Sequence, residues 1–191
     1  MSTKSRLNVI SASTRTGRAG PAIASWFTEI ARAESGFDVH HVDLAALNLP
    51  FLDEPEAAVE GLSYAHEHTR QWSAMTRAAD AFVFVLPEYN RGYPASLKNA
   101  LDFLYYEWND KPVAFVSYGM SSGGMRAVEA IKPVVSTLKM MPINEAVTIH
   151  LRQTIDDEGA LQPTAAMEKA AATLLTELGR VTAAFTAIRP S

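Results

Sequence analysis

Apolar residues gather in five short runs along the chain, each about the length of a β-strand. They span residues 7–12, 37–44, 81–87, 112–119 and 145–151. Three of the runs are almost continuously apolar, which is typical of strands buried on both faces of a parallel sheet. The second run alternates between apolar and polar residues and so suits an edge strand. The pattern predicts a parallel sheet covered by helices on both sides.

The segments between these runs carry apolar residues at helical spacing. The clearest sets are Ala22, Trp26, Phe27 and Ile30; Leu97, Ala100, Leu101 and Leu104; and Met167, Ala171, Leu174, Leu175 and Leu178. Residues 62–79 also read as a helix, and residues 48–62 as a surface loop. Strands that alternate with helices predict the α/β class, here a three-layer αβα fold with right-handed crossovers and the flavodoxin-like strand order 2-1-3-4-5.

Composition narrows the class of protein further. With 191 residues, 48% of them hydrophobic, the chain can bury a substantial core, and we expect one domain over residues 1–191. Its net charge of -4 disfavours a nucleic-acid partner, and no apolar run is long enough to span a membrane, so we expect a cytoplasmic protein. The absence of cysteine excludes disulfides and thiolate catalysis, and the histidines form no convincing set of three metal ligands.

Ligands of such sheets bind at the carboxyl ends of the strands, near the point where the strand order reverses. That rule points to the loops after Ala12, Leu86 and Ser117. We call them the first, second and third loops.

The first loop combines small, polar and basic residues just before a helix. Its members are Ser13, Thr14, Arg15, Thr16, Gly17, Arg18, Gly20 and Pro21. Hydroxyls, backbone N–H groups at a helix start and two arginines suit a single phosphate group. The loop matches neither G-x-x-x-x-G-K-[ST] nor G-x-G-x-x-G, which disfavours nucleoside triphosphates and Rossmann-type dinucleotide binding. Taken alone, an ordinary capped turn remains an equal alternative.

The second loop, within residues 86–104, is shaped by Pro87, Gly92 and Pro94. Tyr89 and Tyr93 supply flat faces that suit a heteroaromatic ligand. We interpret Glu88 as a structural acid rather than a catalytic one, because no second carboxylate or histidine lies near it in the sequence.

The third loop, within residues 116–131, is rich in glycine and serine. Gly119, Gly123 and Gly124 would let the backbone approach a ligand closely, and Tyr118 would stack on it. A glycine-rich turn that only lets a helix pack on the sheet is the alternative for this loop. The meeting of all three loops at one edge is what favours a ligand site.

Three motifs in these loops resemble the NADPH-dependent FMN reductase family of flavodoxin-like flavoproteins, which includes quinone, azo-dye and chromate reductases. The motifs are "SASTRTGR", "PEYNRGYPASLKNALD" and "VSYGMSSGGMRAVE", and the second is the most specific. The resemblance runs from about residue 7 to about residue 184. Two departures are Ala12 and Met120, each where relatives usually have glycine.

The resemblance implies that FMN carries the redox chemistry and that the protein supplies no catalytic side chain. Its phosphate would bind Ser13, Arg15 and Arg18, of which Arg18 stands where many relatives have serine. The isoalloxazine would lie against Pro87, Glu88, Tyr89 and Asn90 on one side and Ser117, Tyr118, Gly119, Gly123 and Gly124 on the other.

The implied activity passes hydride from NADPH or NADH through FMN to a small acceptor such as a quinone, azo compound, metal oxyanion or free flavin. A flavodoxin-type electron carrier without a substrate of its own is the alternative. Residues 102–112, "DFLYYEWNDKP", carry more aromatic side chains than we expect a single face of one small domain to bury. We therefore expect a homodimer, two of which can assemble into a homotetramer.

Overall fold

The computed structural model describes residues 4–34, 36–56 and 63–188. Five strands form one sheet in the order β2-β1-β3-β4-β5, and every neighbouring pair is parallel. They are β1 (Arg6–Ser11), β2 (Asp38–Asp43), β3 (Ala81–Pro87), β4 (Pro112–Gly119) and β5 (Met141–His150). This order confirms the predicted fold class.

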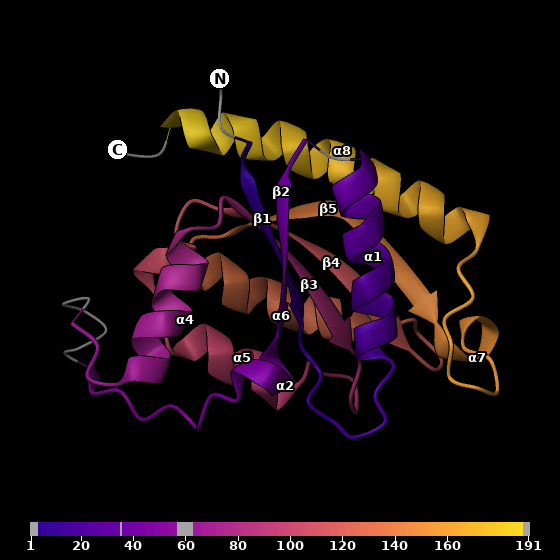
Figure 1. The fold of residues 1–191 in the computed structure, drawn as a ribbon, viewed down its shortest axis with the longest axis horizontal. Coiled ribbons are helices and arrows are strands. Elements are labelled where there is room, and N and C mark those ends of the chain that lie inside the picture. The colour runs from indigo at the N-terminus through magenta and orange to yellow at the C-terminus, as the bar shows by residue number, and fades with distance from the viewer. Residues whose placement is uncertain (1–3, 35, 57–62, 189–191) are drawn as a thin grey trace.

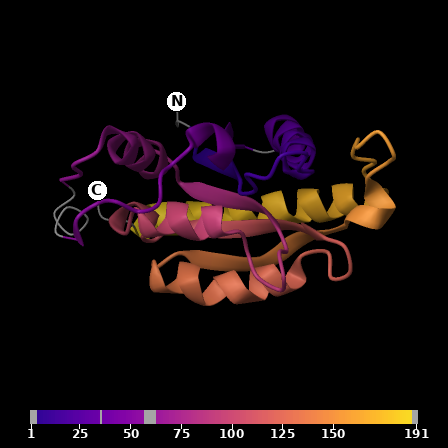
Figure 2. The ribbon, with the colours of Figure 1, turned by 90° about the horizontal axis from the view of Figure 1, so that it is seen from below.

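Helices cover both faces of the sheet (Figures 1 and 2). They are α1 (Gly20–Glu34), α2 (Leu44–Leu47), α4 (Glu67–Arg77), α5 (Ala95–Asp102), the 3-10 helix η1 (Tyr106–Trp108), α6 (Met125–Thr137), α7 (Leu151–Thr154) and α8 (Ala165–Ile188). The apolar side chains of α1 and α8 share one core cluster, and those of α4, α5 and α6 share the other. Figure 2 shows α1 and α6 on opposite sides of the strands.

The central strand β3 shows why both faces must be apolar. Phe82 and Phe84 belong to the cluster with α4, α5 and α6, whereas Val83 and Val85 belong to the cluster with α1 and α8. Successive side chains of a strand point to opposite faces, so a strand with helices on both sides is buried at every position. The edge strand β2 is instead only partly buried: Val39 is buried, whereas Asp38 and His41 are exposed, and the alternation expected from its sequence is not regular.

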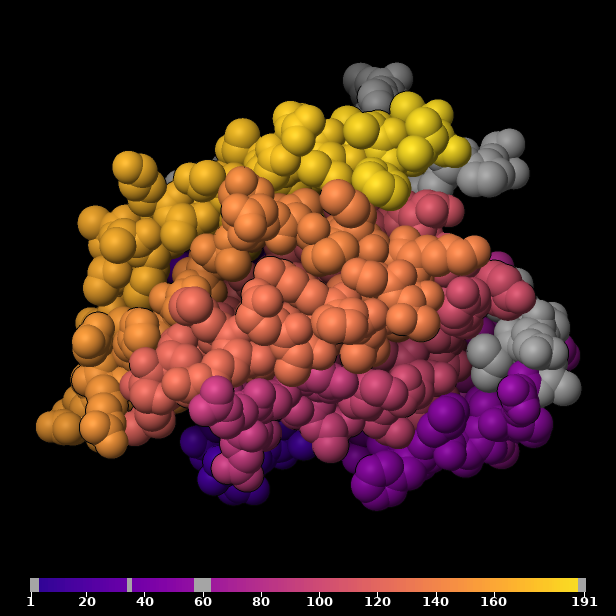
Figure 3. Space-filling model, turned by 180° about the vertical axis from the view of Figure 1, so that it is seen from behind, coloured from indigo at the N-terminus to yellow at the C-terminus, as the bar shows by residue number. Residues whose placement is uncertain are grey.

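The other edge strand, β5, is longer than predicted. It begins at Met141, whose N–H donates to the Lys111 carbonyl over 3.0 Å, rather than at Glu145. The first residues of β5 are mixed in polarity because an edge strand is exposed on one side. Seen from behind, α6 and β5 form much of the surface below α8 (Figure 3).

The helix expected over residues 62–79 starts later. Leu62 lies outside the described residues, and α4 begins at Glu67. The carboxylate of Glu54 accepts hydrogen bonds from the N–H groups of Ala65 and His66, both at 2.9 Å. These bonds hold the chain before α4 in a non-helical path, so tertiary contacts set the start of the helix.

The argument for a dimer from residues 102–112 is wrong. Trp108 is only 1% exposed and packs against Trp72 and Phe82, with ring centroids 5.7 Å and 5.0 Å away. Phe103 is buried as well, and only Tyr106 of this segment is a strongly exposed aromatic, at 47%. The sheet, α4 and α5 together enclose the segment, because η1 turns it back into the core.

Candidate functional site

Hydrogen bonds join the three loops at the carboxyl edge of the sheet. The first and second loops meet where the Ser13 hydroxyl lies 2.6 Å from the Tyr89 hydroxyl. They meet again where Ser96, at the start of α5, donates to the Ala12 carbonyl over 2.5 Å. The second and third loops meet where the Glu88 N–H donates to the Tyr118 carbonyl over 2.9 Å. The three loops therefore form one connected structure, as their positions in the sequence predict.

The first loop leads into the start of α1 through a tight turn. Gly17 has a φ of +66°, which favours glycine. Gly20 begins the helix so close to the sheet that an added Cβ would lie 2.8 Å from the Tyr118 hydroxyl oxygen. Ser13 is buried, whereas Thr14 and Arg15 are exposed. The loop thus presents exposed hydroxyl and guanidinium groups beside a helix N-terminus.

The two arginines of this loop differ in their surroundings. The Arg18 guanidinium forms an ion pair with Asp43 over 2.6 Å, and the same carboxylate caps α2 by accepting from the Ala45 N–H over 3.0 Å. The exposed Arg15 guanidinium lies 5.5 Å from the centroid of the Tyr89 ring. Arg15 is therefore open to an anion, whereas Arg18 already neutralises a carboxylate and fixes the loop against the end of β2.

Glu88 connects the second loop to α6. Its carboxylate accepts hydrogen bonds from the Ser122 hydroxyl, from the Arg126 guanidinium over 3.0 Å and from the Arg126 N–H over 3.2 Å. Burial opposes the charged form of this carboxyl group, but these donors outweigh burial and lower its pKa. Glu88 is thus held as an anion by structural partners, which fits the interpretation of a structural acid.

The third loop needs its glycines for its own packing. Gly123 and Gly124 have φ values of +60° and +91°, and an added Cβ would lie 2.3 Å from Thr148 Cγ2 and 2.6 Å from the Tyr118 nitrogen respectively. The Ser117 hydroxyl donates to the Gly123 carbonyl over 2.9 Å and closes the turn. The requirement for glycine therefore comes from protein atoms, which is what the packing alternative for this loop predicts.

Tyr118 is not available for stacking, contrary to the sequence-based suggestion. Its side chain belongs to the core cluster under α1 and α8, and the residue is only 3% exposed. Burial raises the pKa of its hydroxyl well above the ordinary value, and nearby Tyr89 adds to the shift. What Tyr118 offers to the edge is its backbone.

A cavity of about 530 Å³ opens beside the first loop. Thr14 lines it together with Ser96 and Asn99 of α5 and with Leu49 and Phe51 of the segment after α2. Asn99 holds that segment from both sides, donating to the Pro50 carbonyl over 2.7 Å and accepting from the Leu52 N–H over 3.0 Å. A cavity of this size is typical of small-molecule sites.

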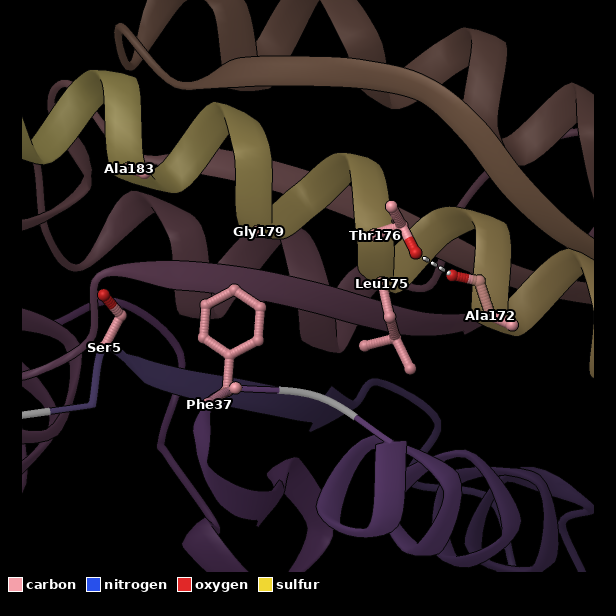
Figure 4. Close-up of a pocket in the computed structure, with 8 residues that line it drawn as sticks. Ser5, Phe37, Ala172, Leu175, Thr176, Gly179 and Ala183 are labelled. Carbon is pink, nitrogen blue, oxygen red and sulfur yellow. Dashed lines mark hydrogen bonds between the residues drawn. The ribbon is translucent and has the colours of Figure 1, made fainter.

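A second cavity, of about 360 Å³, lies at the amino ends of β1 and β2 (Figure 4). Phe37 and Leu175 approach each other across it, and Gly179 lies above the Phe37 ring. The Thr176 hydroxyl, also at this cavity, donates to the Ala172 carbonyl over 2.9 Å within α8. Among the residues that the structure describes, those lining this cavity carry no charge, and the cavity lies at the opposite end of the sheet from the three loops. Its chemistry and position therefore give no reason to assign it the function.

A cluster of metal ligands and a membrane-spanning helix are both absent from the described part of the chain. Residues 4–34, 36–56 and 63–188 contain no group of three His, Cys, Asp or Glu side chains that could hold a metal ion. Within the same ranges, no helix combines the length and apolarity that crossing a membrane requires.

Sheet order and site together define a class: a flavodoxin-like α/β protein in which the arginine-containing loop after β1 is joined to two further loops at the carboxyl edge of the sheet. The model of the family described as NADPH-dependent FMN reductase matches residues 5–154. This chain belongs to that family.

Curated relatives agree with the family match. An NAD(P)H-dependent FMN reductase of Schizosaccharomyces pombe is 47% identical over 136 residues, covering 71% of this chain and 68% of the relative. One of Saccharomyces cerevisiae is 37% identical over 145 residues, with 71% and 75% covered. A probable NADPH:quinone oxidoreductase of Oryza sativa is 35% identical over 144 residues, with 73% and 68% covered.

Solved structures share the fold. The flavoenzyme NAD(P)H:(acceptor) oxidoreductase FerB of Paracoccus denitrificans superposes with a TM-score of 0.68 over 96% of this chain and 98% of that one. Its sequence identity of 20% means that this likeness speaks for the fold alone.

Three residues that organise the site escaped the sequence analysis as site residues. Arg126 clamps Glu88, Asp43 holds Arg18, and Ser96 anchors α5 to the first loop. Arg126 lies in the quoted third motif, so its place there was an available signal. Ser96 likewise lies in the quoted second motif, although the segment that it contacts is 84 residues away. The role of Asp43 depends on a contact with Arg18, 25 residues away, and no local pattern reveals it.

Proposed function

We propose that this chain is an FMN-dependent NAD(P)H oxidoreductase that passes hydride from a nicotinamide nucleotide to a small electron acceptor. The observation that carries the proposal is the joining of the first, second and third loops into one edge site through the Ser13–Tyr89 and Glu88–Tyr118 hydrogen bonds. Family membership supports the same conclusion. When bound, FMN supplies the hydride chemistry itself, so the chain's task is to bind, orient and shield.

The donors of the first loop fit a single phosphate group. Exposed Thr14 and Arg15 stand at the start of α1, where the N–H groups and the helix dipole favour an anion. The buried Ser11 hydroxyl behind them has no hydrogen-bond partner among the described residues, so polar capacity at the base of the loop is unused. We propose that Ser13 and Arg15 hold the FMN phosphate, and that Arg18 acts mainly by fixing the loop through Asp43.

The second and third loops would hold the flavin ring mainly through backbone groups. Pro87, Glu88, Tyr89 and Asn90 would line one side, and Ser117, Tyr118, Gly119, Gly123 and Gly124 the other. This division is supported by the side chains, since those of Glu88 and Ser117 are already occupied by protein partners. The clamp from Glu88 to Arg126 would keep the two loops at a fixed separation, which favours ring binding without further ordering.

The acceptor is proposed only as a class: a quinone, an azo compound, a metal oxyanion or free flavin. The exposed side chain of Met120, where relatives usually have glycine, stands in the third loop and would narrow access for bulky acceptors. Replacing it by Met120→Gly should widen the range of acceptor sizes without changing NADPH oxidation with a small quinone.

Purified protein, reconstituted with FMN, tests the proposed function directly. We expect bleaching of the flavin absorbance when NADPH is added without oxygen, and steady-state NADPH oxidation when a quinone is present. Bleaching without turnover on any acceptor would instead indicate an electron carrier. A protein that binds no FMN in a titration, so that all flavin is removed by desalting, would overturn the proposal.

We also propose a homodimer, two of which can assemble into a homotetramer, and a cytoplasmic location. The aromatic segment at residues 102–112 no longer supports the dimer. Support comes instead from Phe51 and Leu52, which are exposed yet held in place by Asn99. Light scattering at micromolar concentration should give at least twice the chain mass, and Phe51→Asp should lower it. Cell fractionation tests the location, and we expect the protein in the cytoplasmic fraction.

A further inference from the structure

The second loop turns back on itself in a two-residue hairpin. The Tyr89 N–H donates to the Gly92 carbonyl over 2.9 Å, and the Gly92 N–H donates to the Tyr89 carbonyl over 3.0 Å. Between them, Asn90 and Arg91 have φ values of +50° and +72°. Two successive positive φ values are typical of a type I′ turn, which strongly favours asparagine followed by glycine. Arg91 thus stands where the backbone favours glycine.

An arginine in this conformation is strained, because its Cβ crowds the neighbouring carbonyl oxygen. Arg91 is also exposed, and among residues 4–34, 36–56 and 63–188 its guanidinium has no hydrogen-bond or ion-pair partner. No hydrogen bond or ion pair of the Arg91 side chain within the described residues therefore compensates for the strain. Strained residues at a ligand site point to a role in that site.

Two of the other arginines near the site are already paired with carboxylates. Arg18 pairs with Asp43, and Arg126 pairs with Glu88. Arg15 lies over the Tyr89 ring at the first loop, where we propose that it binds the FMN phosphate. Arg91 has no charged partner among the described residues, and it follows directly on the four residues proposed to line the flavin ring. It is placed for a ligand group that extends outward from that ring.

We infer that Arg91 binds the 2′-phosphate of NADPH and makes the protein prefer NADPH over NADH. The inference rests on the proposed function, since nicotinamide must reach the flavin ring while the adenylate end leaves over the rim. The two donors differ only in the phosphate on that adenylate end. A guanidinium binds a phosphate through paired, charge-assisted hydrogen bonds. In a chain with a net charge of -4, such an anion needs a local cation.

The test compares Arg91→Gly and Arg91→Lys with wild type in the FMN-loaded protein. Loss of a hydrogen-bonded phosphate contact should raise the KM for NADPH by about tenfold or more in Arg91→Gly, with the KM for NADH unchanged. Arg91→Lys should lie between, because it keeps the charge but not the paired geometry. Arg180→Gln, which removes an arginine on α8 far from the loops, is the matched control and should change neither value.

Two readouts do not depend on turnover. In calorimetric titrations of the FMN-loaded protein, adenosine 2′,5′-bisphosphate should bind wild type more tightly than 5′-AMP, which lacks only the 2′-phosphate, and Arg91→Gly should remove that difference. Thermal unfolding should show a higher midpoint for Arg91→Gly than for wild type, because glycine relieves the strained turn.

Each other result overturns the inference. Equal changes in KM for NADPH and NADH would place Arg91 on the pyrophosphate, and no change would remove it from nucleotide binding. A wild-type protein that oxidises both donors equally well would overturn the inference and leave the proposed function standing. A wild-type protein that binds FMN and oxidises neither donor would overturn both.

Discussion

Glu88→Gln tests whether the second and third loops are held together by one carboxylate. The side chain of Glu88 is only 10% exposed and accepts three hydrogen bonds from Ser122 and Arg126. Glutamine keeps the size but removes the charge that these donors stabilise. Hydrogen bonds to a charged group contribute about 1.5–3 kcal/mol, and the 42% exposure of Arg126 reduces this by screening, so we expect a loss of about 1–2 kcal/mol.

The size of the loss can be followed by thermal unfolding of the flavin-free protein. For a chain of this length, about 1–2 kcal/mol corresponds to a midpoint lower by roughly 2–8 °C. Glu129→Gln is the matched control. Glu129 lies on α6, the helix that also carries Arg126, and pairs with Lys132 over 2.8 Å, but its side chain is 70% exposed. Exposed pairs contribute little, so this variant should change the midpoint by much less.

The stability that Glu88 contributes should depend on pH. The folded pKa of Glu88 is lowered below its ordinary value of 4.5, so its contribution is fully present above about pH 4.5 and is lost as the pH falls through the folded pKa. The difference in unfolding midpoint between wild type and Glu88→Gln should therefore be constant near neutral pH and disappear in acid. A difference that persists unchanged in acid would refute the reasoning. So would a midpoint change at pH 7 no larger than that of Glu129→Gln.

Two further predictions concern the first and third loops. Arg15→Ala should weaken FMN binding by about tenfold in a fluorescence titration while leaving the unfolding midpoint near wild type, and an unchanged affinity would remove its phosphate role. Gly124→Ala would place a Cβ 2.6 Å from the Tyr118 nitrogen at a residue with a φ of +91°, so urea unfolding should show a loss of stability above about 2 kcal/mol. Gly17→Ala, whose added Cβ meets open space, should lose only about 1 kcal/mol of stability. Equal losses would contradict the packing account.

The sequence predicted that the three loops meet at one edge of the sheet, but it did not predict the contacts of their individual side chains. The rule that ligands bind at the carboxyl ends of parallel strands led to the first, second and third loops. The same reading made Arg18 a phosphate ligand and let Tyr118 stack, yet one pairs with Asp43 and the other is buried under α1. Such roles depend on which distant side chain arrives nearby, and local spacing contains no record of that.

The sequence by itself determined the sheet order, the layers and the edge at which the three loops meet, because apolar periodicity and the handedness of crossovers leave few other arrangements. Only the tertiary structure decided that α4 starts at Glu67, that Trp108 is buried within one chain, and that Arg91 stands strained without a partner in the described part of the chain. These outcomes come from contacts between segments far apart in the chain. Their energies are comparable to the local preferences and can override them.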